Sequence, residues 1–333
     1  MTAPPDPGAR RAARLLRWYP AGWRARYGEE FTELLLAEFA EQPRSWRRAA
    51  DVARSGLLAR LTGAGLTSHP LEPSRQARAG LATAACSLAA FLAVGVAMWS
   101  QLAIGWEWAT ARAAAGATLA LVAMSAAAAF LTALALLAAI PVIWCAGRAL
   151  NRHKERSVRL PVLLVMAGTS VLVFGSRHFA NGWPGTGAHP AAPHGFLPAG
   201  VAAFGWAGTL SVSSYWAHPA ALAAFPAAEI AWMAASPVAL IAAVTGAALL
   251  VRRLDLSPRV LRYEAWLASS AAAGMAVFLA GACCWVLAGG SGPGLFHAGV
   301  IDVASLAVMM LALSTAQRAT GLARRSALGS RPQ

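Results

Sequence analysis

The chain has 333 residues, of which 58% are hydrophobic and only 13% are charged, and its mean hydropathy is +0.52. This composition is typical of an integral membrane protein and argues against an ordinary soluble domain. The formal net charge is +14, but the basic residues lie between apolar segments instead of gathering in one region, so we expect no direct nucleic-acid binding.

Amphipathic helices are predicted in residues 1–66, ahead of the apolar part of the chain. No short apolar region with a small-residue cleavage site is present, so we expect no secretory signal peptide. Aromatic and leucine residues recur at spacings of three and four in residues 23–40, which predicts one buried helix face. The predicted core of this module is Trp23, Tyr27, Phe31 and Leu34, with Leu35 as an alternative to Leu34. A basic helix before Pro20 and a helix after Pro43, whose own apolar stripe includes Trp46 and Leu57, complete a predicted cytosolic three-helix bundle.

Two roles are open for this module. Its first helix carries Arg10, Arg11, Arg14 and Arg17, which suit an amphipathic collar on an anionic inner leaflet. The second helix is acidic, however, and such a surface would repel it. We therefore assign the docking of a soluble partner to three of its carboxylates, Glu29, Glu30 and Glu33.

The stretches "LLRWYPAGWRARYGEEFTELL" and "RRAADVARSGLLARL" resemble the permease-prefix or helix-turn-helix-associated α-helical signalling module that precedes membrane segments in Gram-positive proteins. The matching residues are Tyr19, Pro20, Trp23, Arg26, Tyr27, Gly28, Glu30, Leu34, Leu35, Asp51 and Gly56. The resemblance implies signalling or docking, with a soluble PadR-like regulator or a transporter subunit as partner. The remaining chain resembles uncharacterised multi-pass integral membrane proteins of high-GC Gram-positive bacteria.

Apolar runs of about 20 residues are the length that crosses a membrane as a helix. They predict an all-α polytopic protein with spans at 80–103, 114–146, 160–176, 229–251, 264–288 and 297–316. Between and after the spans, we expect a linker at 67–79, an outer segment at 177–228 and a basic cytosolic tail at 317–333. The domain order is thus 1–66, 67–79, 80–176, 177–228, 229–316 and 317–333. Small residues at four-residue spacing, as at Ala242 and Gly246, would permit close helix packing, although an alanine-rich chain contains such spacings by chance.

The arginines predict the orientation, because basic residues near span ends stay on the cytoplasmic side. Only Arg112 and Arg177 fall in the predicted outer parts, so we expect a cell-membrane protein with both termini in the cytoplasm. Residues 196–216 are apolar enough for a seventh span. A crossing there would move the four arginines of residues 252–263 outside, so we expect this segment to lie on the membrane or dip into it.

Ionisable residues near the predicted outer boundary are candidates for a ligand-binding or structural charge cluster. Arg177, Glu229 and Asp302 stand there, and His178 and His297 could join them. The alternative is that each side chain sits in the interface and is solvated by water. On the first hypothesis the cluster holds the outer segment or binds a polar ligand.

No catalytic or cofactor motif is present. The chain lacks HExxH, GxSxG and Walker A sequences, and its four cysteines lie in or at the ends of apolar stretches without a CxxC pair. Outer histidines such as His189 and His194 more often bind nothing than a metal. We therefore expect no enzyme, cofactor or metal, and predict membrane-anchored signalling or scaffolding. The alternative is a transporter or permease-like subunit for a small molecule or lipid, which would need a polar pathway at mid-depth.

Reporter fusions test the predicted topology. Fusions at residues 155, 257 and 325 should report the cytoplasm, and fusions at 108, 190 and 292 should report the outside, because the arginine distribution requires it. Paired phosphatase and fluorescent-protein fusions at each position are the measurement. A cytoplasmic result at 190 would contradict the topology.

Overall fold

The computed structural model describes residues 7–41, 46–67, 72–103, 115–151, 156–179, 227–288 and 300–329. Every regular element within these ranges is an α-helix, as predicted. The chain divides into two compact units, residues 1–72 and 73–333, which are taken in turn below.

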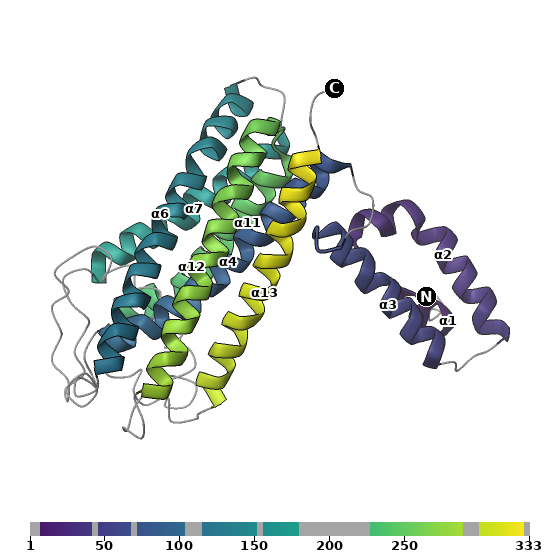
Figure 1. Ribbon diagram of the computed structural model, residues 1–333. Helices are drawn as coiled ribbons and strands as arrows, with labels where there is room; N and C mark the ends of the chain where they lie inside the picture. The colour runs from purple at the N-terminus through teal and green to yellow at the C-terminus, as the bar shows by residue number, and fades with distance from the viewer. Residues whose placement is uncertain are drawn as a thin grey trace. The chain divides into compact units, whose positions relative to one another are not determined.

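The N-terminal unit consists of α1 (Pro7–Leu16), α2 (Ala21–Glu41) and α3 (Trp46–Gly63) (Figure 1). Helix α1 contacts both α2 and α3. Helix α2 begins after Pro20, whose carbonyl accepts a hydrogen bond from the Arg24 amide at 3.0 Å. Helix α3 ends in a Schellman motif: Gly65 takes a φ of 74°, and the Leu66 amide reaches back to the Leu61 carbonyl at 2.9 Å.

The core of the N-terminal unit draws on all three helices and on the turn between α1 and α2. Its buried residues are Ala12, Tyr19, Leu35 and Val52, with Leu15, Trp23, Phe31, Phe39 and Ala59 packed against them. The predicted core position Leu34 is wrong, because its side chain is 61% exposed whereas that of Leu35 is 2% exposed. Tyr27, also predicted in the core, is exposed and touches the cluster only at its edge, through Trp23.

Six long helices form the second unit. They are α4 (Pro73–Ala103), α6 (Ala115–Asn151), α7 (Arg156–Phe179), α11 (Ala227–Arg253), α12 (Pro258–Ala288) and α13 (Val300–Gly329). Each contains a segment long and apolar enough to cross a membrane. The described chain is therefore that of a multi-pass membrane protein, in agreement with the six predicted spans.

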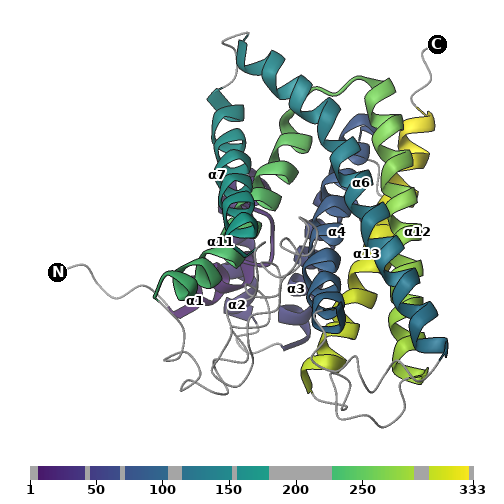
Figure 2. The same cartoon turned by 90° about the vertical axis from the view of Figure 1, so that its left-hand side faces the viewer.

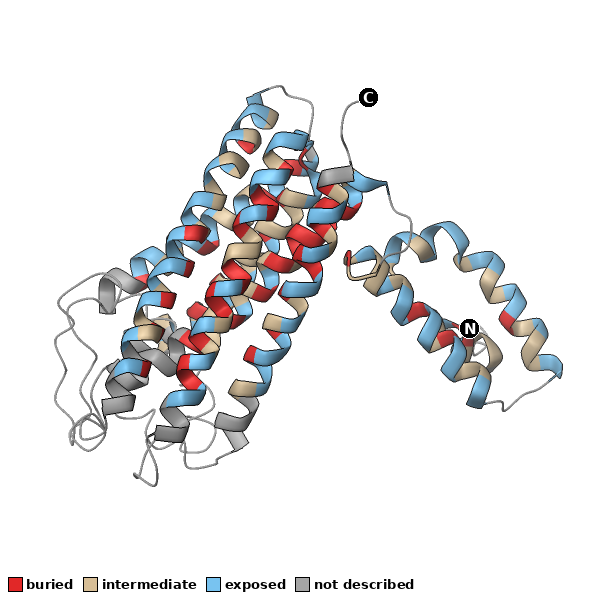
Figure 3. Ribbon diagram, viewed as in Figure 1, coloured by how far each residue is buried: buried red, intermediate tan, exposed pale blue. Residues whose placement is uncertain are grey.

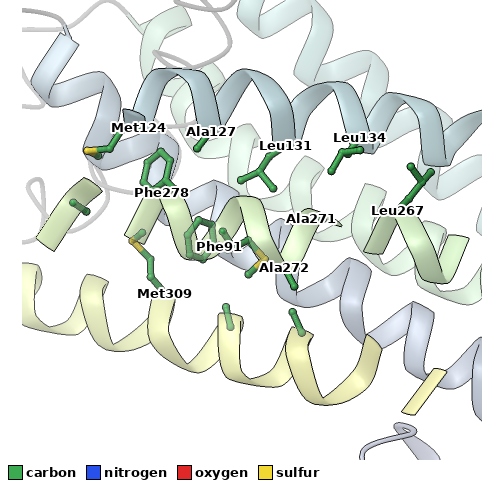
Figure 4. Close-up of a cluster of buried hydrophobic side chains, with 14 of the residues drawn as sticks. Phe91, Met124, Ala127, Leu131, Leu134, Leu267, Ala271, Ala272, Phe278 and Met309 are labelled. Carbon is green, nitrogen blue, oxygen red and sulfur yellow. The ribbon is translucent and has the colours of Figure 1, made fainter. Parts of the chain in front are cut away.

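Helix α4 holds this unit together, since it contacts α13, α11, α12 and α6. Helix α7 packs mainly on α11, and α6 packs on α12 (Figure 2). Apolar side chains from α4, α6, α12 and α13 fill the main core, which Figure 4 shows. At its centre the rings of Phe91 and Phe278 meet edge to face, with their centroids 5.6 Å apart.

Glycines stand where the helix pairs approach most closely. A Cβ on Gly168 of α7 would lie 2.5 Å from the Ala239 carbonyl oxygen of α11, and one on Gly246 of α11 would lie 2.7 Å from the Pro161 oxygen of α7. A Cβ on Gly80 of α4 would likewise lie 2.8 Å from the Ala319 oxygen of α13. Small residues let helix backbones make van der Waals contact in lipid, where apolar burial drives little association.

Two predicted boundaries are wrong. Helix α4 begins at Pro73, inside the predicted linker, and α13 continues to Gly329, through most of the predicted basic tail. Both extensions bury small residues, including Ala77 and Ala323, while Arg75, Arg324 and Arg325 are exposed. Charged residues ended the apolar runs in the sequence, but on a helix they occupy only one side.

Gly168→Ala should destabilise the six-helix unit by about 1–3 kcal/mol, because its new methyl group overlaps the backbone of α11. Thermal unfolding of the purified chain in detergent measures this. Gly147→Ala is the matched control, since a Cβ there meets nothing within 4 Å. A loss of stability at Gly147 equal to that at Gly168 would refute the packing explanation.

Candidate functional site

One side of α2 is built differently from the rest of the N-terminal unit. Tyr27, Glu30, Glu33 and Leu34 are all exposed and recur at helical spacings, so they form one continuous surface, here named the α2 outer face. In Figure 3 most of α2 is coloured as exposed. The α2 outer face thus presents two apolar side chains next to two carboxylates. Glu29, the third predicted docking residue, is also exposed, at the neighbouring position of the helix.

Aromatic contacts fix the first turns of α2 against the turn that precedes it. Tyr19 stacks on Trp23 with ring centroids 4.0 Å apart, and Phe31 meets Trp23 edge to face at 5.3 Å. Further along, the Arg11 guanidinium of α1 lies over the Phe39 ring at 4.7 Å. These contacts set which side of α2 turns inward and which remains outward.

Helix α3 holds the turn between α1 and α2. The Arg60 guanidinium donates hydrogen bonds to the carbonyls of Trp18 at 2.6 Å and Arg17 at 2.5 Å, and so satisfies groups that the end of α1 leaves without helical partners. Gly56 lets the turn approach, because a Cβ there would lie 2.7 Å from the Trp18 Cβ. Arg48 of α3 also pairs with Glu38 of α2 at 3.1 Å.

The apolar stripe predicted for the third helix is wrong. Trp46 is 73% exposed and Leu57 is also exposed, while Val52 and Gly56 face the core. The unit therefore leaves several large apolar side chains outside its core: Trp18, Tyr27, Leu34, Trp46, Leu57 and Leu58.

The predicted outer charge cluster is placed only at the level of the backbone. Arg177 and His178 stand near the end of α7, Glu229 in the first turn of α11 and Asp302 in the first turn of α13. Their side chains, and the whole of His297, lie outside the described residues. The cluster therefore stays a prediction.

At the other end of the six-helix unit the arginines gather. We name this the arginine end; it is formed by the starts of α4, α7 and α12 and the ends of α6, α11 and α13 (Figure 1). Its arginines are Arg75, Arg78, Arg148, Arg156, Arg159, Arg252, Arg253, Arg259, Arg262, Arg318, Arg324 and Arg325.

Some of these arginines bind backbone. Pro161 of α7 has no amide hydrogen, so the Ser157 carbonyl lacks its helical donor, and the Arg253 guanidinium of α11 donates to it instead. The Arg78 guanidinium of α4 donates to the Leu254 carbonyl at 3.1 Å. From the sequence, the arginines were used only to predict the orientation in the membrane, and their hydrogen bonds to backbone carbonyls were missed. Pro161 is the residue that could have indicated such a bond, because it leaves a helix carbonyl without its donor.

Sequence reasoning also missed Glu264, one and a half turns into α12. Its side chain is only 8% exposed, and its Oε1 atom has no hydrogen-bond partner among the described residues. A carboxyl group so placed in a membrane-spanning helix is a functional candidate. The sequence does indicate this burial: Glu264 stands three residues from both Leu261 and Leu267 and so falls on the same side of the helix as these buried residues.

The described residues contain no group of three or more histidine, cysteine or acidic side chains that could hold a metal ion. No protein-family model, curated protein or solved structure matches the chain. The candidate site accordingly rests on the geometry of α2 and of the arginine end.

Leu35→Ala should lower the free energy of unfolding of the N-terminal unit by about 2–5 kcal/mol, because it leaves a cavity between the three helices. Leu34→Ala makes the same chemical change at the adjacent exposed position and should be nearly neutral. Hydrogen exchange of the α2 amides in the full-length protein measures both. Equal losses of protection would show that the α2 outer face belongs to the core.

Proposed function

We propose that this protein is a membrane-anchored scaffold or signalling protein, in which six membrane-spanning helices anchor an N-terminal helical unit whose α2 outer face docks a soluble partner. The partner class is a regulator of the PadR-like kind or a subunit of a transporter. No catalytic step is part of this proposal.

The arginine end supports a cytoplasmic location for the N-terminal unit. Basic residues at span ends are retained in the cytoplasm, so the arginine end faces inward. The N-terminal unit is followed in the chain by α4, which begins at Pro73. The start of α4 and the end of α13 both belong to the arginine end of the six-helix unit. Both termini are then cytoplasmic, and the predicted three-helix module meets soluble proteins of that compartment.

The observation that carries the docking role is the exposure of Leu34, which directly follows Glu33 and lies one helical turn after Glu30. Leu35, its neighbour, already fills the core, so folding of the unit does not use Leu34. An exposed apolar side chain beside carboxylates fits a protein interface, in which an apolar centre has a polar rim. The carboxylates select a partner with a basic surface and disfavour anionic lipid.

A capture experiment with the full-length protein in its native membrane tests this. Glu30→Lys and, separately, Leu34→Ser should abolish or strongly weaken capture of a soluble partner after chemical crosslinking, because each removes one part of the α2 outer face. Mass spectrometry of the captured proteins, compared with the unmodified chain, gives the result.

Asp51→Lys is the matched control. Asp51 is exposed on α3 and its reversal changes the charge by the same amount as Glu30→Lys, so capture should persist. Equal loss in the control would mean that net charge, and no particular surface, governs capture. Protection of α2 by anionic vesicles, with no protein retained, would instead establish the lipid-collar role.

A transporter or permease-like subunit is the second candidate, and Glu264 is the observation that favours it. Buried ionisable groups in membrane helices often belong to substrate or proton pathways. Two features weigh against it: Glu264 lies near the arginine end and not at mid-depth, and the main core that continues along α12 is apolar, with Leu267, Ala271 and Met275 in succession. Docking is therefore the better-supported function.

A further inference from the structure

Helix α3 presents a second surface to the surroundings, on a different helix from the α2 outer face. Its core side is formed by Val52 and Gly56, which are buried. The side chains on the side away from these two residues are exposed and recur at helical spacings (Figure 3). We name them the α3 outer face: Trp46, Arg47, Arg54, Leu57 and Leu58.

The α3 outer face combines large apolar groups with cations. Trp46 is 73% exposed, and Leu57 and Leu58 are about half exposed. The Arg47 guanidinium lies over the Trp46 ring at 5.8 Å, so an indole and a cation share one end of the surface. Tryptophan and leucine beside arginine is the composition with which amphipathic helices lie in a membrane interface.

The charges of the N-terminal unit are separated by helix. Helices α1 and α3, with the turn that follows α1, carry eight arginines and one carboxylate, whereas α2 carries two arginines and five glutamates. The one carboxylate is Asp51, which stands at the edge of the α3 outer face and offsets part of its positive charge. An anionic lipid surface attracts the basic helices and repels α2, so the unit would meet such a surface through α3 and not through the α2 outer face.

The connection to α4 keeps α3 within reach of a membrane. Helix α3 ends at Gly63, and α4 begins at Pro73, which is also the first residue of its candidate membrane span. A chain of this length extends to at most about 35 Å, so the end of α3 is always closer than this to the start of the span. A lipid surface is therefore present at high effective concentration, whereas a soluble molecule has to diffuse to the α3 outer face.

We infer that the α3 outer face binds the anionic surface of the membrane in which the six helices are anchored. The arginines pair with lipid phosphates, while Trp46 and the leucines enter the headgroup region. Charge would also allow the acidic α2 of a second copy, but that contact would occupy the carboxylates assigned to the soluble partner. The inference rests on the cytoplasmic location argued in the proposed function, and it does not require the docking of a partner.

The test uses the full-length protein in lipid nanodiscs that contain phosphatidylcholine alone or phosphatidylcholine mixed with phosphatidylglycerol. A photoreactive phenylalanine analogue replaces Leu58 in one sample and Leu34, a leucine of the α2 outer face, in another. After irradiation, position 58 should form lipid adducts in the discs that contain phosphatidylglycerol. Yields should be low at position 58 in phosphatidylcholine alone and at position 34 in both kinds of disc. Mass spectrometry of the protein measures the yields.

The double variant Arg47→Gln with Arg54→Gln should lower the adduct yield at position 58 by about threefold or more, because it removes two charges that attract the anionic surface. The double variant Arg24→Gln with Arg26→Gln is the matched control, since it removes the same charge from exposed positions of α2, and it should keep the yield. All four arginines are exposed. Hydrogen exchange of the α2 amides in neutral detergent should therefore stay unchanged, which reports that the unit is folded in both variants.

Four results would overturn the inference: equal yields at positions 34 and 58, equal yields in the two lipid compositions, equal losses in the two double variants, or adducts at position 58 with a second copy of the chain in place of lipid. The discs contain no soluble protein. Such a result would therefore refute membrane binding by α3 and leave partner docking to be decided by the capture experiment.

Discussion

Backbone-to-backbone contact between helices is the constraint on which the six-helix unit depends. In lipid, apolar side chains gain little by leaving one apolar surrounding for another, so helices associate where their surfaces fit closely. Glycines supply that fit between α7 and α11, between α6 and α12, and between α4 and α13. Because the contacts set the helix registers, they also bring the six arginine-bearing ends to one level and so create the arginine end.

The arginines of the arginine end fall into two groups. Some of their side chains satisfy backbone carbonyls, as Arg253 does where Pro161 interrupts the hydrogen bonding of α7. Others, such as Arg148 and Arg262, are exposed. A body anchored in the membrane gives the N-terminal unit a fixed point of attachment, while the α2 outer face remains available to a soluble partner on our proposal.

The sequence predicted the six spans because hydrocarbon thickness imposes a length that apolar runs reveal directly. It did not predict the first turns of α4 or the last turns of α13, since arginines interrupt the apolar run there although alanines such as Ala77 and Ala323 line the buried side. The spacing of Ala242 and Gly246 did coincide with a close contact, at Gly246, but composition alone could not separate this spacing from chance ones.

Within the N-terminal unit the failures are also local. Leu34 and Leu35 both fit the predicted spacing, and only the packing of α2 against α1 and α3 selects Leu35. Helix α3 faces the core through Gly56. A prediction based on bulky apolar residues therefore assigned the wrong side of this helix to the core. Glu264 was missed because it adjoins the basic connection before α12 and so resembled a boundary residue. Glu29, Glu30 and Glu33 are exposed as the docking hypothesis requires, although exposure alone does not identify a partner.

Site-specific photocrosslinking tests the central claim most directly. A photoreactive amino acid at position 34 of the full-length protein, irradiated in intact cells, should form an adduct with a soluble cytoplasmic protein. The same amino acid at position 136, an exposed leucine in the apolar part of α6, should form adducts with lipid. Adducts with lipid alone at position 34 would contradict the claim that the α2 outer face docks a protein.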